Sequence, residues 1–270
     1  MEENLLFENY LYRGENKITI MDVDFFLDRV VMLPKIRPHE LEKAVSLSAD
    51  YSKIADFRGK MIEKYIKCPI LLYKLNKRGI FMFDEIEPFL GKRDTFILSY
   101  YFRKDIENFE VFIKNKNRPK DFDEFFLENT NNIENLIEYG FWPSSIEYNL
   151  KYDIIDELWE YKFLEQEAKW SPFEWSNKPN SLDLLSFSGF FGSIKCFKQL
   201  LLNGFNVNEK VLPMVICSGS LDLFHLCQGP RFISSKNACK ASEFSQLSLL
   251  NFMIENGADI NGHTDNIEFL

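Results

Sequence analysis

Histidine, basic charge and glycine-rich motifs are scarce in this chain of 270 residues. Only three histidines occur, and no glycine or serine pattern matches a phosphate-binding loop or the nucleophile turn of a hydrolase. The 32 Lys and Arg residues are outnumbered by 41 Asp and Glu, so the formal charge is −9. Proteins that follow nucleic-acid phosphates need a basic face. We therefore expect no enzyme, no cofactor and no nucleic-acid partner.

Long hydrophobic runs and secretion signals are also missing. The longest nearly uncharged segment, Val211–Cys227, is interrupted by Pro213 and falls short of the ~20 apolar residues that cross a bilayer. The N-terminal residues are acidic and lack the positive region that opens a secretory signal. The five cysteines are odd in number and lie mostly within apolar helical patterns, which is typical of reduced core residues. These features predict a cytoplasmic protein without a membrane span.

Three residues near the end of that segment could suggest a metal site. They are Cys217, His225 and Cys227. A zinc site normally takes four ligands at close spacing, and these three candidates lie on apolar helical segments. Carboxylate pairs such as Asp84/Glu85 are typical of solvated helix faces, whereas general acid–base catalysis needs two groups in one cleft. We expect neither a metal ligand nor a catalytic residue among these groups.

An internal repeat is the strongest positive signal. Gly192–Asn208 reads GSIKCFKQLLLNGFNVN, and Ser245–Asn261 reads SQLSLLNFMIENGADIN. Each copy has a small residue, a Leu-rich amphipathic run, an Asn-Gly pair and then Val-Asn or Ile-Asn. The pattern predicts a helix that ends where Gly204 or Gly257 adopts the left-handed conformation.

The rest of the chain also has helical apolar spacing, which predicts an all-α fold. We place a soft boundary at the polar segment Lys114–Lys120, which separates an N-terminal helical region of unknown function, residues 1–120, from repeats in residues 121–270. The helices expected before the boundary are Met21–Leu33 (ended by Pro34), His39–Leu47, Tyr51–Ile66, Pro69–Leu75, Phe81–Leu90, Asp94–Arg103 and Ile106–Ile113. Those expected between the boundary and residue 183 are Ile133–Tyr139 (ended by Gly140), Ser145–Tyr152 and Ile154–Phe163.

Residues Asp183–Leu270 resemble ankyrin repeats. The second-helix part of the family pattern, G-H-L-E-x-V-K-L-L-L-x-x-G-A-x-V/I-N, is matched by Gly192–Asn208 and by the ending Asn256–Asn261. The middle repeat, Val211–Gln228, keeps Gly-Ser-Leu-Asp at the corresponding place. The family's Thr-Pro-Leu-His is missing from all three repeats. The chain is similar to divergent ankyrin-type proteins, expanded in some protists, that carry an upstream helical domain of unknown function.

The repeats are shorter than those of the family. Gly192, Gly219 and Ser245 lie 27 and 26 residues apart, against about 33 in ankyrin arrays. The resemblance therefore implies an α-solenoid of helix hairpins with reduced fingers. One hairpin cannot bury its own apolar stripe, so neighbours must stack. The expected core is Phe187, Ile194, Phe197, Leu200, Leu201, Leu212, Val215, Leu223, Leu226, Leu249, Phe252 and Met253.

The resemblance implies a protein partner bound on the concave face and at the fingertips. The corresponding tip residues are Asn206, Asn208, Glu209, Asp259, Asn261 and His263. The aromatic loop Glu165–Ser181 offers Trp170 and Trp175 as further anchors, unless they pack on Ile154–Phe163 and seal the array.

Two alternatives to partner binding remain. In the first, the chain is a structural protein that self-associates through its C-terminal repeat, because the sequence stops at Asp265–Leu270, where a further repeat should open. In the second, residues 1–120 hold an enzyme site, which would require a polar pocket with perturbed titratable groups.

Overall fold

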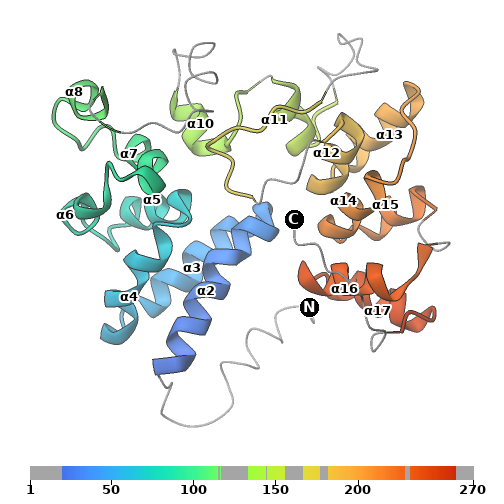
Figure 1. Ribbon diagram of the computed structural model, residues 1–270, viewed down its shortest axis with the longest axis horizontal. Coiled ribbons are helices and arrows are strands. Elements are labelled where there is room, and N and C mark those ends of the chain that lie inside the picture. Colours follow the sequence, from blue (N-terminus) through green and yellow to red (C-terminus); the bar gives the residue numbers. More distant parts are fainter. Residues whose placement is uncertain are drawn as a thin grey trace.

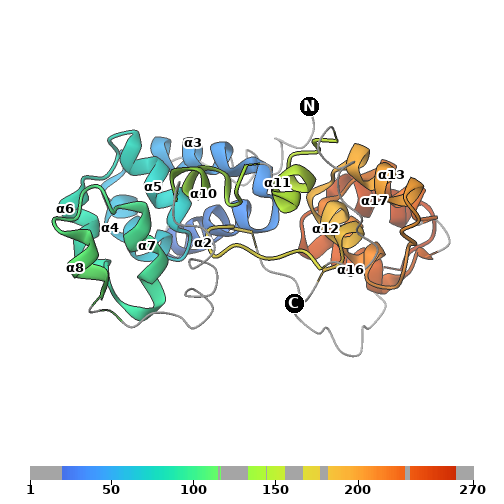
Figure 2. The same ribbon diagram turned by 90° about the horizontal axis from the view of Figure 1, so that it is seen from above.

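The computed structural model describes residues 20–114, 116, 133–143, 145–155, 167–176, 182–228 and 232–259. Over these residues the protein is all-helical, and the β pairing among them is limited to one isolated bridge between Glu167 and Asp183. The predicted helical class is therefore confirmed. The helices follow an arc from α4 through α10 and α11 to α17, with α2 between the two arms (Figure 1). From above, the helices form two groups side by side (Figure 2).

The first group contains the helices from α2 to α10. Their bounds are α2 Ile20–Ile36, α3 Leu41–Tyr51, α4 Ala55–Tyr65, α5 Pro69–Lys77, α6 Phe83–Ile86, α7 Phe96–Tyr101, α8 Phe109–Lys114 and α10 Ile133–Tyr139, with short 3-10 turns η1 Pro38–Glu40, η2 Glu87–Phe89 and η3 Arg93–Thr95. The expected end at Pro34 is wrong, because this proline lies inside the last turn of α2. A proline there removes one N–H donor near a helix end, and the backbone N–H of Arg37 still donates to the carbonyl of Leu33 at 2.8 Å.

One hydrophobic core unites this group. Its largest fully buried side chains are aromatic, including Phe57, Tyr65, Phe81, Phe96 and Phe102. The core also takes in side chains from α10 and the buried Phe173. The boundary expected near residue 120 stays a prediction, since residues 117–132 lie outside the described part of the chain.

Over the described residues, the second group consists of α11 and three helix pairs. The bounds are α11 Ile146–Lys151, α12 Leu184–Phe191, α13 Ile194–Leu202, α14 Val211–Ser218, α15 Leu221–Leu226, α16 Ser235–Glu243 and α17 Leu247–Glu255. The first helices of the pairs stack in a row, with α11 against α12, α12 against α14, and α14 against α16. All eight residues of α12 are buried as a result. Among the described residues, no helix is both long and apolar enough to cross a membrane.

A left-handed residue stands at each of the three turns within a pair. These residues are Gly192 and Gly219, both with φ +73°, and Ser245 with φ +54°. The intervals seen in the sequence are therefore intervals between equivalent turns. Gly204 and Gly257, with φ +93° and +98°, follow α13 and α17, which confirms the predicted helix ends.

The predicted core of the repeats is largely correct. Eight of the twelve expected side chains are buried, and Ile194, Leu201 and Phe252 are partly buried. Leu226 is the exception, with 37% of its surface exposed. It is the last residue of α15, and the neighbouring Leu223, Phe224 and Cys227 are the side chains that enter the core there.

Ser245 provides a test of the turn geometry. A left-handed conformation costs a residue with a Cβ roughly 1–2 kcal/mol, and glycine recovers this apart from its larger entropy loss. We expect Ser245→Gly to raise the free energy of unfolding by about 0.5–1 kcal/mol, measured by chemical denaturation. The control is Asn251→Gly at an exposed position within α17, which should lower it by about 0.3 kcal/mol. A loss of stability in both variants would contradict the assigned turn.

Candidate functional site

The segment between α13 and α14 carries three of the predicted tip residues. Asn206, Asn208 and Glu209 are all exposed. The Asn208 side chain is fixed from two sides, since its Oδ1 accepts from the backbone N–H of Lys210 at 2.8 Å and its Nδ2 donates to Asp183 Oδ2 at 3.2 Å. Asp183 in turn caps α12 by accepting from the backbone N–H of Ser186 at 2.7 Å. The tip is thus tied to the start of the same helix pair.

The remaining tip residues are described in part. Asp259 is exposed just after α17. Asn261 and His263 lie outside the described residues, so their placement stays a prediction.

The two tryptophans predicted as surface anchors pack against other aromatic rings. Trp170 is half-buried, and its ring centroid lies 5.7–6.1 Å from those of four phenylalanines, namely Phe141, Phe187, Phe190 and Phe191. Trp175, also half-buried, donates its indole N–H to the carbonyl of Pro38 at 3.3 Å. The alternative in which both tryptophans pack on Ile154–Phe163 and seal the array stays a prediction. The contacts described are to α12 and η1, while most of Ile154–Phe163 lies outside the described residues.

The first helices of the pairs offer little free surface. α12 is buried throughout, and α14 is buried except at Pro213 and Ser218. The corner between α2 and η1 covers part of this row of first helices. Ile36 packs against the second core, and Arg37 donates to the carbonyl of Ser245. α16 differs, because Lys236, Ser242 and Glu243 are exposed there; the sequence alone did not reveal this asymmetry.

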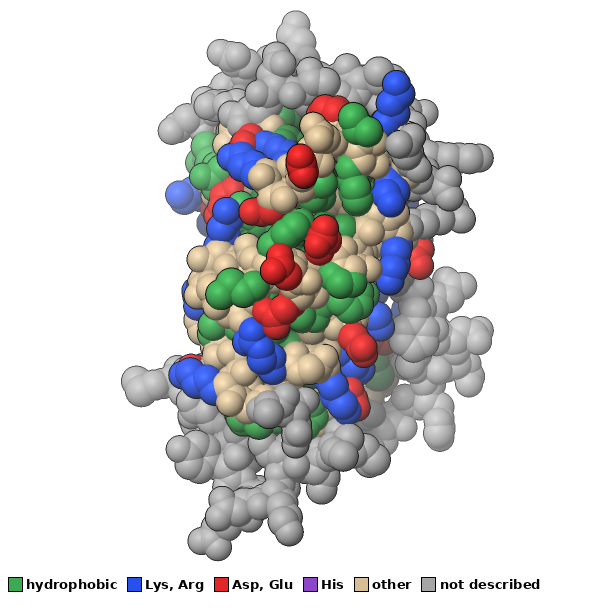
Figure 3. Space-filling model, turned by 90° about the vertical axis from the view of Figure 1, so that its left-hand side faces the viewer, with side chains coloured by type: hydrophobic (Ala, Val, Ile, Leu, Met, Phe, Trp, Pro, Cys, Tyr) green, Lys and Arg blue, Asp and Glu red, His purple; other side chains and the backbone are tan. Residues whose placement is uncertain are grey.

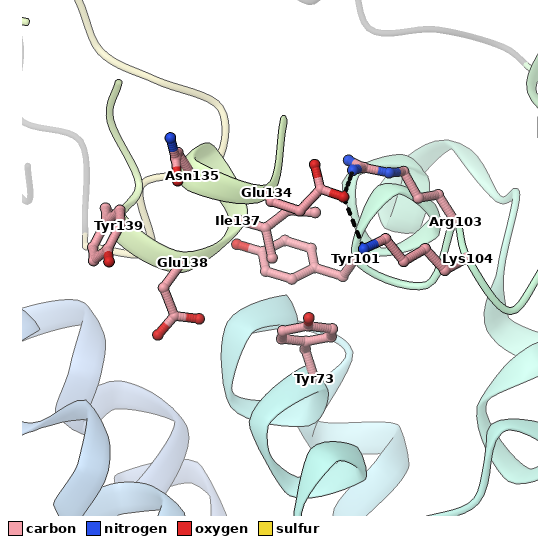
Figure 4. Close-up of a pocket in the computed structure, with 9 residues that line it drawn as sticks. All are labelled: Tyr73, Tyr101, Arg103, Lys104, Glu134, Asn135, Ile137, Glu138 and Tyr139. Carbon is pink, nitrogen blue, oxygen red and sulfur yellow. Dashed lines mark ion pairs between the residues drawn. The ribbon is translucent and has the colours of Figure 1, made fainter. Parts of the chain in front are cut away.

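A polar hollow of about 320 Å³ lies between α5, α7 and α10 (Figure 4). Glu134 from α10 reaches Arg103 at 2.5 Å and Lys104 at 2.9 Å, across the hollow's α7 side. Glu138 from α10 reaches Lys74 on α5 at 3.1 Å. The full lining is Tyr73, Tyr101, Arg103, Lys104, Glu134, Asn135, Ile137, Glu138 and Tyr139.

The sequence did not predict this hollow. α10 lies beyond the boundary expected at residue 120, so its contact with α5 and α7 depends on long-range packing that apolar spacing does not encode.

Two titratable groups of the hollow, Glu134 and Tyr101, have pKa values far from neutral pH. Arg103, with Lys104, lowers the pKa of Glu134 to about 2, so this carboxylate stays ionised. Burial raises the pKa of Tyr101, whose hydroxyl donates to the carbonyl of Phe173 at 3.3 Å. A general acid or base works best with a pKa near the operating pH. The arrangement instead holds α10 on α5 and α7 through ion pairs.

Cys217, Cys227 and His225 have structural surroundings. Burial raises the pKa of Cys217 to about 12 and that of Cys227 to about 11, which favours the thiol over the metal-binding thiolate. His225 is exposed and packs edge-on against Phe252, with ring centroids 5.3 Å apart. Within the described ranges, no group of three or more His, Cys, Asp or Glu residues could hold a metal ion.

The outer face of the first group carries no concentration of one charge. Acidic, basic and hydrophobic side chains are intermixed over the part of this face that is coloured by type in Figure 3. Such a face lacks the basic stripe that phosphate backbones require.

No protein-family model matches the chain, and no curated protein or solved structure is significantly similar to it. Functional inference therefore depends on the geometry of the chain itself.

The ion pairs of Glu134 predict a specific acid response. Because its folded pKa is lowered to about 2 from a usual 4.5, its stabilising contribution is complete above about pH 4.5 and is lost as the pH falls through 2. Half of the side chain is exposed, so the effect is modest. We expect Glu134→Gln to lower the thermal midpoint by roughly 1–3 °C at pH 6 and to have a much smaller effect at pH 2, where half of the folded carboxylates are protonated. Glu63→Gln, at an exposed site on α4, serves as the control, and an equal shift in both variants would argue against the ion pairs.

Proposed function

We propose that this protein is a non-enzymatic protein-binding module, built as an α-solenoid of degenerate ankyrin-type hairpins behind an N-terminal helical region. The observation that carries the proposal is the recurrence of one hairpin geometry three times. Gly192, Gly219 and Ser245 mark equivalent left-handed turns, and α12, α14 and α16 stack in sequence order. Stacked hairpins of this kind present an extended, rigid surface at little ordering cost.

The binding surface that we assign is the tip between α13 and α14, with residues 202–210. Leu202 is 81% exposed and Val207 is 38% exposed, and the polar Asn206, Asn208 and Glu209 lie beside them in the segment. An apolar centre with a polar rim is the usual anatomy of a protein interface. The hydrogen bonds of Asn208 hold the segment in place before a partner arrives.

The concave face exposes fewer side chains to a partner than the concave face of an array of full-length ankyrin repeats. α12 is completely buried and α14 nearly so, which leaves the exposed polar residues of α16 as the available part of that face. We assign no catalytic step and no cofactor, because the carboxylates of the polar hollow are paired with lysine and arginine.

A photo-crosslinking residue at position 202 of the full chain tests this assignment. We expect it to capture specific proteins from an extract of the source cells, and we expect capture to drop at least tenfold when Asn206→Arg and Glu209→Arg are added. The matched control places the same group at Met82, which is 62% exposed in the first group. Equal capture at both positions, or capture that survives the tip substitutions, would contradict the assigned surface.

The alternative is self-association through the C-terminal repeat, and it is favoured by the exposed Ile254. This side chain is 38% exposed near the end of α17, in the last helix pair. A second copy of the chain could cover this side chain by packing on α17.

Light scattering over a range of concentrations decides between the two functions. If the chain self-associates, we expect its apparent molecular mass to rise with protein concentration. We expect Ile254→Glu to abolish this rise. Ile54→Glu, which introduces the same charge at a 42% exposed isoleucine before α4, should leave it intact. A monomer at every concentration would remove the alternative.

A further inference from the structure

The junction between the two helical groups is crossed by a short strap, residues 168–176. Trp170 belongs to the second core, where it packs against the phenylalanines of α12. Phe173, only three residues later, is 1% exposed and belongs to the first core. Trp175 then reaches η1 through its bond to Pro38. The strap is therefore held by both cores.

A buried ion pair fastens this strap to α11. Lys151 Nζ lies 2.7 Å from Glu174 Oε2, and the two side chains are 1% and 0% exposed. The ammonium also donates to the carbonyl of Tyr139 at 3.0 Å, while Glu174 Oε1 accepts from the backbone N–H of Ser176 at 3.0 Å. The end of α10, the end of α11 and the strap all meet at this pair.

Aromatic rings enclose the ammonium. Its Nζ lies 3.5 Å from the ring centroid of Trp175 and 5.3 Å from that of Tyr152. The rings of Phe141 and Phe191, both in the second group, lie at 5.7 Å. Burial lowers the pKa of Lys151, whereas the Glu174 carboxylate favours the charged form. Water cannot take over the role of either partner here, so separating the pair leaves an uncompensated charge.

Gly140 leaves the room that the carboxylate needs. Its φ is +83°, and a Cβ at this position would meet Glu174 Oε2 at 2.5 Å. Gly79 has a similar φ of +70°, yet a Cβ there would meet nothing within 4 Å. The two glycines thus share a backbone conformation and differ in what lies beside them.

We propose that the Lys151–Glu174 pair is a lock that couples the two cores, so that the helical groups open and unfold as one unit only while the pair is intact. α11 is bound into the second group through its packing on α12 and the bond from the Ser193 hydroxyl to the carbonyl of Leu150. Glu174 directly follows Phe173, whose side chain lies in the first core. The pair therefore joins α11 to the strap at the junction of the two groups, beside the corner after α2, where Arg37 also donates to Ser245 of the second group.

The test compares Gly140→Ala with Gly79→Ala in the full chain. Amide hydrogen exchange is measured along a denaturant series. The amides of α5 report the unfolding midpoint of the first core, and the amides of α14 report that of the second core. In the unaltered chain the two midpoints should coincide. Gly79→Ala strains only the backbone, so both midpoints should fall together. Gly140→Ala should separate them, because the new methyl group displaces the carboxylate. Midpoints that move together in Gly140→Ala, or that already differ in the unaltered chain, would overturn the proposal.

A second pair of variants isolates the charge. Lys151→Met leaves Glu174 buried without its cation, and we expect the thermal midpoint to fall by roughly 6–20 °C and the two cores to unfold separately. Adding Glu174→Leu removes the remaining charge, so more than half of the lost midpoint should return, while the two transitions should stay separate because the pair is still missing. If the two transitions merge again in the double variant, packing across the junction rather than the ion pair couples the cores, and the lock is rejected.

Discussion

The burial of one ammonium group is the constraint on which the junction of this protein depends. A lysine that is 1% exposed must find an anion, acceptors and polarisable surroundings within reach, because water is excluded. The chain supplies all three from separate segments: Glu174 from the strap, the carbonyl of Tyr139 from the end of α10, and rings from both sides of the junction. Each of these groups fixes a backbone segment, so satisfying a single charge determines how three segments meet. A buried ion pair is weak evidence for net stability, yet it penalises arrangements that separate its partners.

Stacking of short helices is the second constraint, and it explains the repeats. Helices of six to nine residues, such as α12 to α17, are marginal in isolation, so their stability comes from the neighbours on which they pack. The reversal within each pair has to be tight, which requires a left-handed residue after the first helix. Glycine meets this requirement in two pairs, and Ser245 meets it with strain in the third. Gln246, directly after Ser245, donates to the carbonyl of Cys217 in the preceding pair, so this strained turn also connects neighbours.

The sequence predicts the helices well because their signals are local. Apolar spacing and helix-ending glycines indicated the elements from α2 to α17, and the intervals of 27 and 26 residues between Gly192, Gly219 and Ser245 indicated the repeat. The functional features were harder to predict, because they arise from contacts between distant residues. Lys151 and Glu174 are 23 positions apart and look like solvated charges in the sequence. Trp170 and Trp175 look like surface anchors until the phenylalanines of α12 and the carbonyl of Pro38 are placed beside them. The polar hollow joins α10 to α5 and α7, and no spacing rule relates those segments.

The distribution of burial separates the parts of the molecule that hold it together from the part proposed to bind a partner. Aromatic and polar side chains of the strap contact α11, α12 and the corner after α2. These side chains therefore stabilise the fold. The tip after α13 is different, since Leu202 and Val207 remain exposed although the segment beside them is anchored through Asn208 and Asp183. An apolar side chain on an anchored backbone gains burial energy on contact without a large ordering cost. The tip is anchored through Asp183, whereas the lock bonds to Tyr139 and Ser176, so the two sites share no hydrogen-bonding group and substitutions at them should act independently.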